Sequence, residues 1–331
     1  MGADNHCTGG LYAMVSADGI HWSMLQEEPI ITQGGFDSQN VVFWDSVRGE
    51  YRAYIRDFRD GRCRDIRTAT SDDFLNWTDP VWLEYPGALE EQLYTNQIIP
   101  YHRAPHLFVG FPTRYTEREW SESTNAMPEL SHRRLRSSVS PRYGTALTDG
   151  LFMSSRDGKT FNRWGEVFIR PGLRPQDNWT YGDNYQNWGV VETESDLPGA
   201  PRELSFYVTE GYWRGESTTF RRHTLRLDGF VSVQAPMSGG AFVTQPLRFE
   251  GSRLVLNVST SAAGSVRVEI QNADGRPLPG FSLADCDEIV GDEIERVVSW
   301  KQGSRVGHLA GKPIRLRFVI HDADLYALRF E

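Results

Sequence analysis

The sequence has little cysteine and no long apolar run. Cys7, Cys63 and Cys286 are the only cysteines among 331 residues, and no CxxC or HExxH motif is present. We interpret all three as ordinary thiols, and we expect no metal site and no cofactor. Because a membrane-spanning helix needs about 18 or more consecutive apolar residues, and no such run occurs, no membrane segment is expected.

Basic residues are outnumbered by acidic ones. The chain has 35 Lys and Arg against 44 Asp and Glu, a net charge of −9, and its basic residues are scattered. Nucleic-acid surfaces need clustered positive charge, so nucleic acid is not an expected partner. The start, MGADNHCTGG, lacks the basic and apolar regions of an export signal, which leaves the compartment open; a periplasmic or secreted location would need a longer N-terminus.

Aromatic residues are abundant instead. They make up 12% of the chain, with 10 Trp and 13 Tyr. These side chains combine a flat apolar face with a polar tip, which suits a sugar surface. We therefore expect carbohydrate as the partner. No GxSxG elbow accompanies the histidines, so Ser-His-Asp hydrolase chemistry has little support.

A short motif of the form S-x-D-(G)-x-x-aromatic recurs along the chain. It occupies residues 16–22, 71–77 and 155–161, each time after a short β-like run. Ser and Asp side chains bond nearby backbone N–H groups in turns, while the aromatic residue returns to the core. The motif predicts a hairpin staple between two strands, with a structural role.

The staples belong to a longer repeat. Matched strand pairs precede the second and third staples, and a third copy of the pair begins at Asn184. Each unit has the size and strand pattern of a propeller blade. We place blades at 36–90, 91–175 and 183–235, and only a third and fourth strand in residues 9–35. The expected fold is all-β: a five-bladed type β-propeller over residues 1–235, incomplete at its N-terminus.

From about residue 236 the pattern changes to longer strands that alternate apolar and polar residues. Asp274-Gly275 and Ala310-Gly311 supply turns. This pattern predicts a β-sandwich of jelly-roll type over residues 236–331. The expected strands are 241–249, 252–260, 265–275, 296–300 and 314–331.

Candidate site residues follow from strand direction. In an antiparallel blade the start of the innermost strand and the end of the next strand lie at one face. Polar residues at those positions should surround one axial pocket, which the insertion 116–142 could overhang. Our catalytic candidates are Asp37, Asp57 and Glu210. Our sugar-binding candidates are Asn40, Arg56, Tyr94, Asn96, Arg114, Tyr185, Asn187 and Tyr212.

The stretch FDSQNVVFWDSVRGEYRAYIRDF (36–58) and the staples resemble the five-bladed propellers of glycoside hydrolase families 32, 43 and 68. The sandwich after the propeller is similar to family 32, and the whole pattern to bacterial family 32-like proteins. The resemblance implies a funnel with three acidic residues, in which Asp37 would stabilise the transition state or tune a pKa. Asp37 matches the Asp of the Arg-Asp-Pro motif of these families, but the Arg and Pro are absent here, and near the first strand of the next blade only Glu90 and Glu91 are acidic.

Three hypotheses stay open at this point. The first is a glycosidase that uses paired carboxylates, which needs one proton donor and one nucleophile or base. The second is a carbohydrate-binding protein without turnover. The third is an inactive shortened form whose exposed blade edges promote homo-oligomers.

Overall fold

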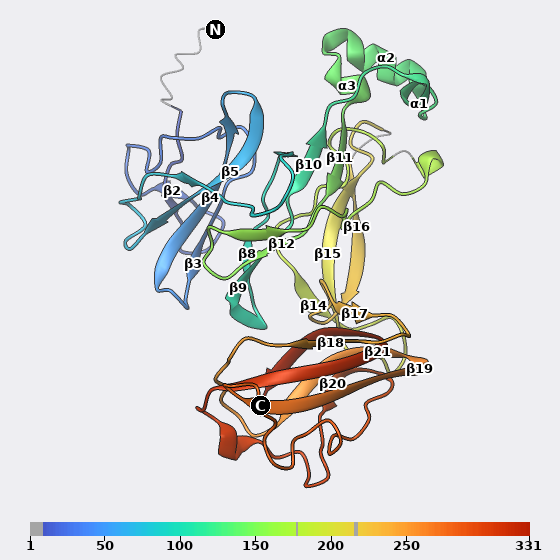
Figure 1. Ribbon diagram of the computed structural model, residues 1–331. Helices are drawn as coiled ribbons and strands as arrows, with labels where there is room; N and C mark the ends of the chain where they lie inside the picture. Colours follow the sequence, from blue (N-terminus) through green and yellow to red (C-terminus); the bar gives the residue numbers. More distant parts are fainter. Residues whose placement is uncertain (1–8, 177, 215–217) are drawn as a thin grey trace. The chain divides into compact units, whose positions relative to one another are not determined.

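The computed structural model describes residues 9–176, 178–214 and 218–331, and the chain is mostly β (Figure 1). It divides into two compact units. The N-terminal unit comprises Met1–Val191 and Ser205–His223, and the C-terminal unit comprises Glu192–Leu204 and Thr224–Glu331. Within the described ranges, no helix is both long enough and apolar enough to cross a membrane.

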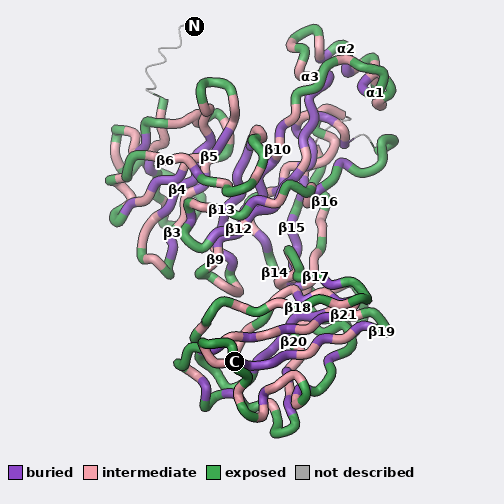
Figure 2. Tube along the Cα trace, in the orientation of Figure 1, coloured by how far each residue is buried: buried purple, intermediate pink, exposed green. Residues whose placement is uncertain are grey.

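The first repeat is a four-stranded antiparallel sheet. Its order is β3-β4-β5-β6, and buried residues concentrate on β4 and β5 (Figure 2). Tyr54 and Ile66, from the two central strands, are fully buried in its core. This sheet confirms the four-strand pattern expected for residues 36–90. The strands are β3 (Val41–Asp45), β4 (Glu50–Arg59), β5 (Cys63–Ser71) and β6 (Val81–Trp82).

The second repeat is also antiparallel, and each of its inner strands is interrupted once. One part is a four-stranded sheet of order β13-β12-β9-β8, and the other is a three-stranded sheet of order β11-β10-β7. Three short helices fill the insertion between β10 and β11. The elements are β7 (Gln92–Leu93), β8 (Ile99–Tyr101), β9 (Ala104–Gly110), β10 (Thr113–Thr116), α1 (Glu122–Asn125), α2 (Leu130–Val139), α3 (Arg142–Thr145), β11 (Leu147–Gly150), β12 (Met153–Ser155) and β13 (Phe161–Arg163).

The third repeat has three described strands, of order β14-β15-β16. Strand β17, which lies within the range expected for this repeat, pairs with β21. Residues 9–35 form the expected hairpin, β1 with β2. The elements are β1 (Met14–Val15), β2 (Ser23–Met24), η1 (Arg174–Gln176), β14 (Val191–Thr193), β15 (Glu203–Glu210), β16 (Thr219–Arg226) and β17 (Val233–Ala235).

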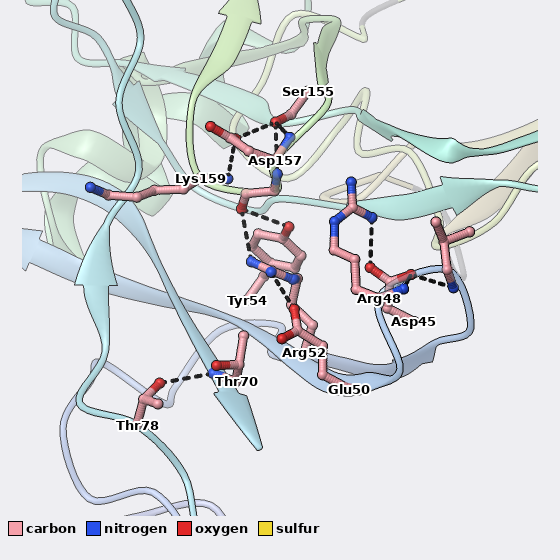
Figure 3. Close-up of polar contacts among 12 residues, drawn as sticks. Asp45, Arg48, Glu50, Arg52, Tyr54, Thr70, Thr78, Ser155, Asp157 and Lys159 are labelled. Atoms are coloured by element: carbon pink, nitrogen blue, oxygen red, sulfur yellow. Dashed lines mark hydrogen bonds and ion pairs between the residues drawn. The ribbon is translucent and has the colours of Figure 1, made fainter. Parts of the chain in front are cut away.

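Hydrogen bonds to backbone carbonyls join successive repeats. The Tyr54 hydroxyl donates to the Gly158 carbonyl over 2.9 Å (Figure 3). The Asn96 amide donates to the Tyr54 carbonyl over 3.4 Å, and the Trp188 indole donates to the Ile98 carbonyl over 3.2 Å. Each repeat is therefore positioned by the backbone of another.

All three staples have the same hydrogen-bond pattern. The serine hydroxyl donates to the aspartate and accepts from the aspartate N–H, and the aspartate accepts from the N–H groups two and three residues on. Figure 3 shows Ser155 and Asp157 of the third staple. The predicted hydrogen bonds are confirmed at Ser16 and Asp18, at Ser71 and Asp73, and at Ser155 and Asp157. The aromatic residue of the third staple, Phe161, is buried as expected, but Trp22 of the first staple is exposed, so its predicted return to the core is wrong.

The described strands from β17 onward form one five-stranded sheet. Strand β21 pairs with β17, β18 and β19, and β19 also pairs with β20. Side chains from the connecting segments, among them Phe281 and Trp300, cover the core. The expected sandwich of two sheets is thus not confirmed, and two of the expected strands are the single strand β19. The elements are β18 (Gly240–Val243), β19 (Leu254–Asn272), β20 (Asp292–Val297), η2 (Gly307–Leu309) and β21 (Ile314–Phe330).

The cysteines behave as expected where they are described. Cys63 is half-buried and Cys286 is buried, and both are free thiols. Burial raises the pKa of each thiol. Cys7 lies outside the described residues.

We predict that the third staple stabilises the N-terminal unit in a pH-dependent way. Burial raises the pKa of Asp157, but the N–H groups of Lys159 and Thr160 outweigh that effect and lower it to about 2. Because this lies below the unfolded value of about 3.9, the stabilisation is complete above about pH 4 and disappears as the pH falls to about 2. Asp157→Ala should lower the free energy of unfolding by about 1 kcal/mol at pH 7.

Urea denaturation from pH 7 to pH 2 measures the effect. The control is Asp274→Ala, which removes the same side chain from an exposed turn of the C-terminal unit. A deficit of Asp157→Ala that persisted unchanged at pH 2 would contradict this assignment.

Candidate functional site

Six tyrosine rings gather in the N-terminal unit. The Tyr94 hydroxyl lies 2.7 Å from the Tyr181 hydroxyl, and the Tyr94 ring centroid lies 5.8 Å from that of Tyr115 and 5.7 Å from that of Tyr185. Three arginines contact these rings. We call the set the tyrosine–arginine cluster: Tyr94, Tyr115, Tyr143, Tyr181, Tyr185, Tyr212, Arg56, Arg64 and Arg142.

Two of the arginines lie over the same two rings. The Arg56 guanidinium lies 4.4 Å from the Phe58 ring centroid and 6.0 Å from that of Tyr94. The corresponding distances for Arg64 are 5.4 Å and 5.1 Å. Arg56 is only 1% exposed, and burial lowers its pKa, as does the nearby charge of Arg64. Like charges are thus held close together here.

The third arginine comes from the helical insertion. Arg142 begins α3, and its guanidinium lies 5.1 Å from the ring centroids of both Tyr143 and Tyr181. Burial lowers the pKa of Arg142, but hydrogen bonds with Tyr115 and Tyr143 outweigh burial and raise it. The insertion expected over the site therefore supplies a cation to it.

The Tyr185 hydroxyl stands apart from the other phenols. Its oxygen is buried and has no hydrogen-bond partner in the part of the chain that the structure describes. Burial raises the pKa of Tyr185 well above its usual range, and that of Tyr181 likewise. Both phenols are therefore neutral at ordinary pH, and the Tyr185 hydroxyl can donate to a ligand.

Strand β10 separates this cluster from a second group of charges. Successive side chains on a strand point to opposite faces, so Tyr115 faces the tyrosines while Arg114 faces away. Asp149 pairs directly with Arg114 in the neighbouring strand β11. Two carboxylates and two arginines meet on this second face, and we call them the Glu91 network: Glu91, Arg114, Asp149 and Arg163.

Arg114 binds two carboxylates at once. Its Nε and Nη2 donate to Asp149 over 2.9 and 2.8 Å, and its Nη1 donates to Glu91 over 2.7 Å. Glu91 also pairs with Arg163. Burial raises the pKa of Glu91, but the hydrogen bonds from Arg163 and Arg114 outweigh burial, so the pKa is lowered. Glu91 is therefore a carboxylate, suited to the role of nucleophile or base and not to that of proton donor.

Two cavities meet the Glu91 network. One, of about 720 Å³, is lined by Glu91, Arg114, Asp149 and Trp179 among others. The other, of about 520 Å³, shares Glu91 and also contacts Arg163. The first is large enough for a small ligand and combines an indole with paired charges.

The three predicted catalytic carboxylates do not meet one another. Asp37 is exposed and pairs with Arg56, which places it beside the tyrosine–arginine cluster. Asp57 points to the opposite face of β4 from Arg56 and binds Arg67 over 3.1 Å. Arg56 and Asp57 are adjacent on β4, so their side chains lie on opposite faces of the strand. The sequence prediction placed both residues in one pocket and did not take this alternation into account.

Glu210 occupies a third place. It binds the exposed Arg221 over 2.7 Å, across β15 and β16.

Of the predicted sugar-binding residues, Arg56, Tyr94, Tyr185 and Tyr212 come together in the tyrosine–arginine cluster, whereas Arg114 lies on the other side of β10.

The predicted asparagines have mainly backbone partners. Asn40 donates to the Ser38 carbonyl over 2.9 Å, and the fully buried Asn96 holds the Ile98 N–H over 3.2 Å. The Asn187 N–H donates to the Tyr207 carbonyl as part of the third repeat. The buried Oδ1 of Asn40 has no hydrogen-bond partner in the described part of the chain.

Several cluster residues escaped the sequence reasoning. Tyr181 lies in an irregular segment and Arg142 begins α3, and Arg64 and Asp149 lie on third strands; the search for strand starts and ends excluded all of these positions. The density of Tyr and Arg near 142 and 181 was the available signal, but it gives no distances.

Comparison with known proteins adds distant similarities only. A scan of protein-family models and a search of curated proteins find no match. Among solved structures, the chain is similar to a Bombyx mori GH32 β-fructofuranosidase (9% identity, 96% of this chain and 72% of that chain, TM-score 0.38). Another is an exo-β-1,3-galactanase from Phanerochaete chrysosporium in a structure with galactose (9%, 95% and 88%, 0.26).

A third similar structure is an N-acetylgalactosamine deacetylase from F. plautii in complex with blood group B trisaccharide. Its identity is 11%, the match covers 59% of this chain and 51% of that chain, and the TM-score is 0.38. The chain thus spans about half the length of this enzyme. Identities and TM-scores this low do not assign the chain to a family.

We predict that the Glu91 network is important for stability. Glu91→Gln leaves Arg163, whose side chain is 2% exposed, without its carboxylate. Removing one partner of a buried pair costs about 3 kcal/mol, which should appear as a lower midpoint in urea denaturation. Glu84→Gln, which breaks the exposed pair with Lys159, is the matched control and should stay close to wild type. Equal midpoints for the two variants would refute the prediction.

Proposed function

We propose that this chain is a glycoside hydrolase-like protein that binds an oligo- or polysaccharide through the tyrosine–arginine cluster. The observation that carries the proposal is the buried hydroxyl of Tyr185, which has no partner in the described part of the chain, among five further tyrosines. Phenol rings pack on sugar faces and their hydroxyls bond sugar hydroxyls. Leaving a hydroxyl buried and unpaired costs about 1–3 kcal/mol, and a bound sugar would remove that cost.

The proposal includes the architecture. We interpret the repeats as blades of a propeller of the five-bladed type, followed by a sandwich-like C-terminal domain. The antiparallel strand order of the first two repeats supports this reading, as do the hydrogen bonds that join successive repeats. In such an arrangement the strand starts that carry Tyr94 and Tyr185 converge on one site.

Binding without cleavage fits the carboxylates best. Hydrolysis needs two carboxyl groups about 5–5.5 Å or about 6.5–9.5 Å apart across the bond. The three predicted carboxylates instead bind three different arginines: Asp37 with Arg56, Asp57 with Arg67 and Glu210 with Arg221. A role for them as one catalytic set therefore has no geometric support.

A second candidate function has its own observation. Glu91 and Asp149 bind one guanidinium and line the same cavity as Trp179. A glycosidase needs at least two carboxyl groups at its active site. Under this alternative, sugar cleavage takes place on the opposite face of β10 from the tyrosines.

Tyr185→Phe tests the binding site. The variant should bind polysaccharide about tenfold more weakly, because it lacks a buried hydroxyl that has no partner among the described residues, whereas its stability should not fall. Affinity electrophoresis in gels that contain neutral or acidic polysaccharides gives the binding, and thermal denaturation gives the stability. The control is Tyr54→Phe, whose hydroxyl bonds Gly158; it should lose stability and keep its affinity.

Reducing-sugar release separates the two candidate functions. We expect no release from any polysaccharide that the protein binds. Release that Asp149→Asn abolishes, with binding retained, would establish the second candidate and overturn binding without cleavage.

A further inference from the structure

Two guanidiniums of the tyrosine–arginine cluster, those of Arg64 and Arg142, have no carboxylate partner in the described part of the chain. Arg56 and Arg64 share the rings of Phe58 and Tyr94, so the two guanidiniums repel each other. Only Arg56 has a carboxylate partner, Asp37, whose side chain is 77% exposed. Arg64 donates instead to the neutral Gln92 side chain over 2.5 Å.

Arg142 adds a third cation to the same rings. Both Arg64 and Arg142 lie over the Tyr115 ring, at 4.4 and 5.9 Å from its centroid. Within the described ranges, neither of them forms an ion pair with a carboxylate. Other carboxylates near the cluster have partners of their own. Glu117 accepts a hydrogen bond from the Tyr115 hydroxyl over 3.0 Å, Asp57 binds Arg67, and the buried Asp183 accepts from the Tyr212 N–H over 2.8 Å.

Arg64 and Arg142 therefore lie on the rings without a carboxylate partner among the described residues, in a chain whose net charge is −9. Half-buried guanidiniums without counterions are costly unless a ligand supplies negative charge. Guanidinium groups bind planar carboxylates and tetrahedral oxyanions in bidentate fashion.

We infer that the ligand of this cluster is an acidic carbohydrate, whose anionic group binds between Arg64 and Arg142 while its ring packs on the tyrosines. The inference rests on the proposed binding function and gives its substrate class. A carboxylate, as in a uronic acid, and a sulfate ester share the required chemistry. The Tyr185 hydroxyl is the neutral donor that accompanies the two charged ones.

Affinity electrophoresis of the full chain tests the class of ligand. The gels contain pectate or alginate for carboxylates, carrageenan or fucoidan for sulfates, and galactan, arabinan, xylan or inulin as neutral polymers. We expect retardation by an acidic polymer and none by the neutral ones, and the two acidic sets tell carboxylate from sulfate. Retardation by neutral polymers alone would overturn this inference and leave the proposed function standing, whereas no retardation by any polymer would overturn both.

Arginine variants test the position of the anionic group. Arg64→Gln and Arg142→Gln should each weaken binding of the acidic polymer at least tenfold and reduce its dependence on salt. Arg276→Gln makes the same charge change on an exposed turn of the C-terminal unit and should have no effect. If all three variants lost affinity equally, binding would reflect overall charge and the inference would fail; thermal denaturation excludes loss of folding as the cause.

Discussion

Strand alternation at a single dipeptide determines the chemistry of the N-terminal unit. Arg114 and Tyr115 are adjacent on β10, so their side chains must lie on opposite faces of a small three-stranded sheet. Tyr115 completes a group of phenols with cations over their rings, and Arg114 completes a network of paired charges. A shift of one residue in the register would exchange the two and place an arginine with two carboxylate partners among the tyrosines.

The two faces treat their arginines differently. In the Glu91 network each guanidinium has a carboxylate, and the hydrogen bonds that Arg114 donates to Asp149 and Glu91 raise its pKa. In the tyrosine–arginine cluster the guanidiniums lie on aromatic rings, which offer a weaker, less directional attraction. The first arrangement is complete without a ligand. In the tyrosine–arginine cluster, N–H and O–H donors and positive charge remain available to a ligand.

Contacts between residues close in the sequence were predictable, whereas ion pairs between side chains on different strands were not. The staples depend on contacts within three residues, so Ser16, Ser71 and Ser155 were identified correctly with their turns. The partners of Asp57 and Glu210 depend on arginines in other strands, at distances that no spacing rule gives. The pairing of β17 with β21 likewise depends on a strand that lies about 80 residues further along the chain.

The order of strands in the C-terminal unit has a consequence for synthesis. Strand β21 pairs with β17, β18 and β19, yet it follows all of them in the chain. A ribosome delivers the N-terminal partner strands first, and none of them has its main neighbour until β21 emerges. Pairing of Leu254 with Phe330 closes a long loop, which slows sheet formation. The apolar faces of β18 and β19 are therefore exposed during translation, at the stage when a nascent chain depends most on chaperones.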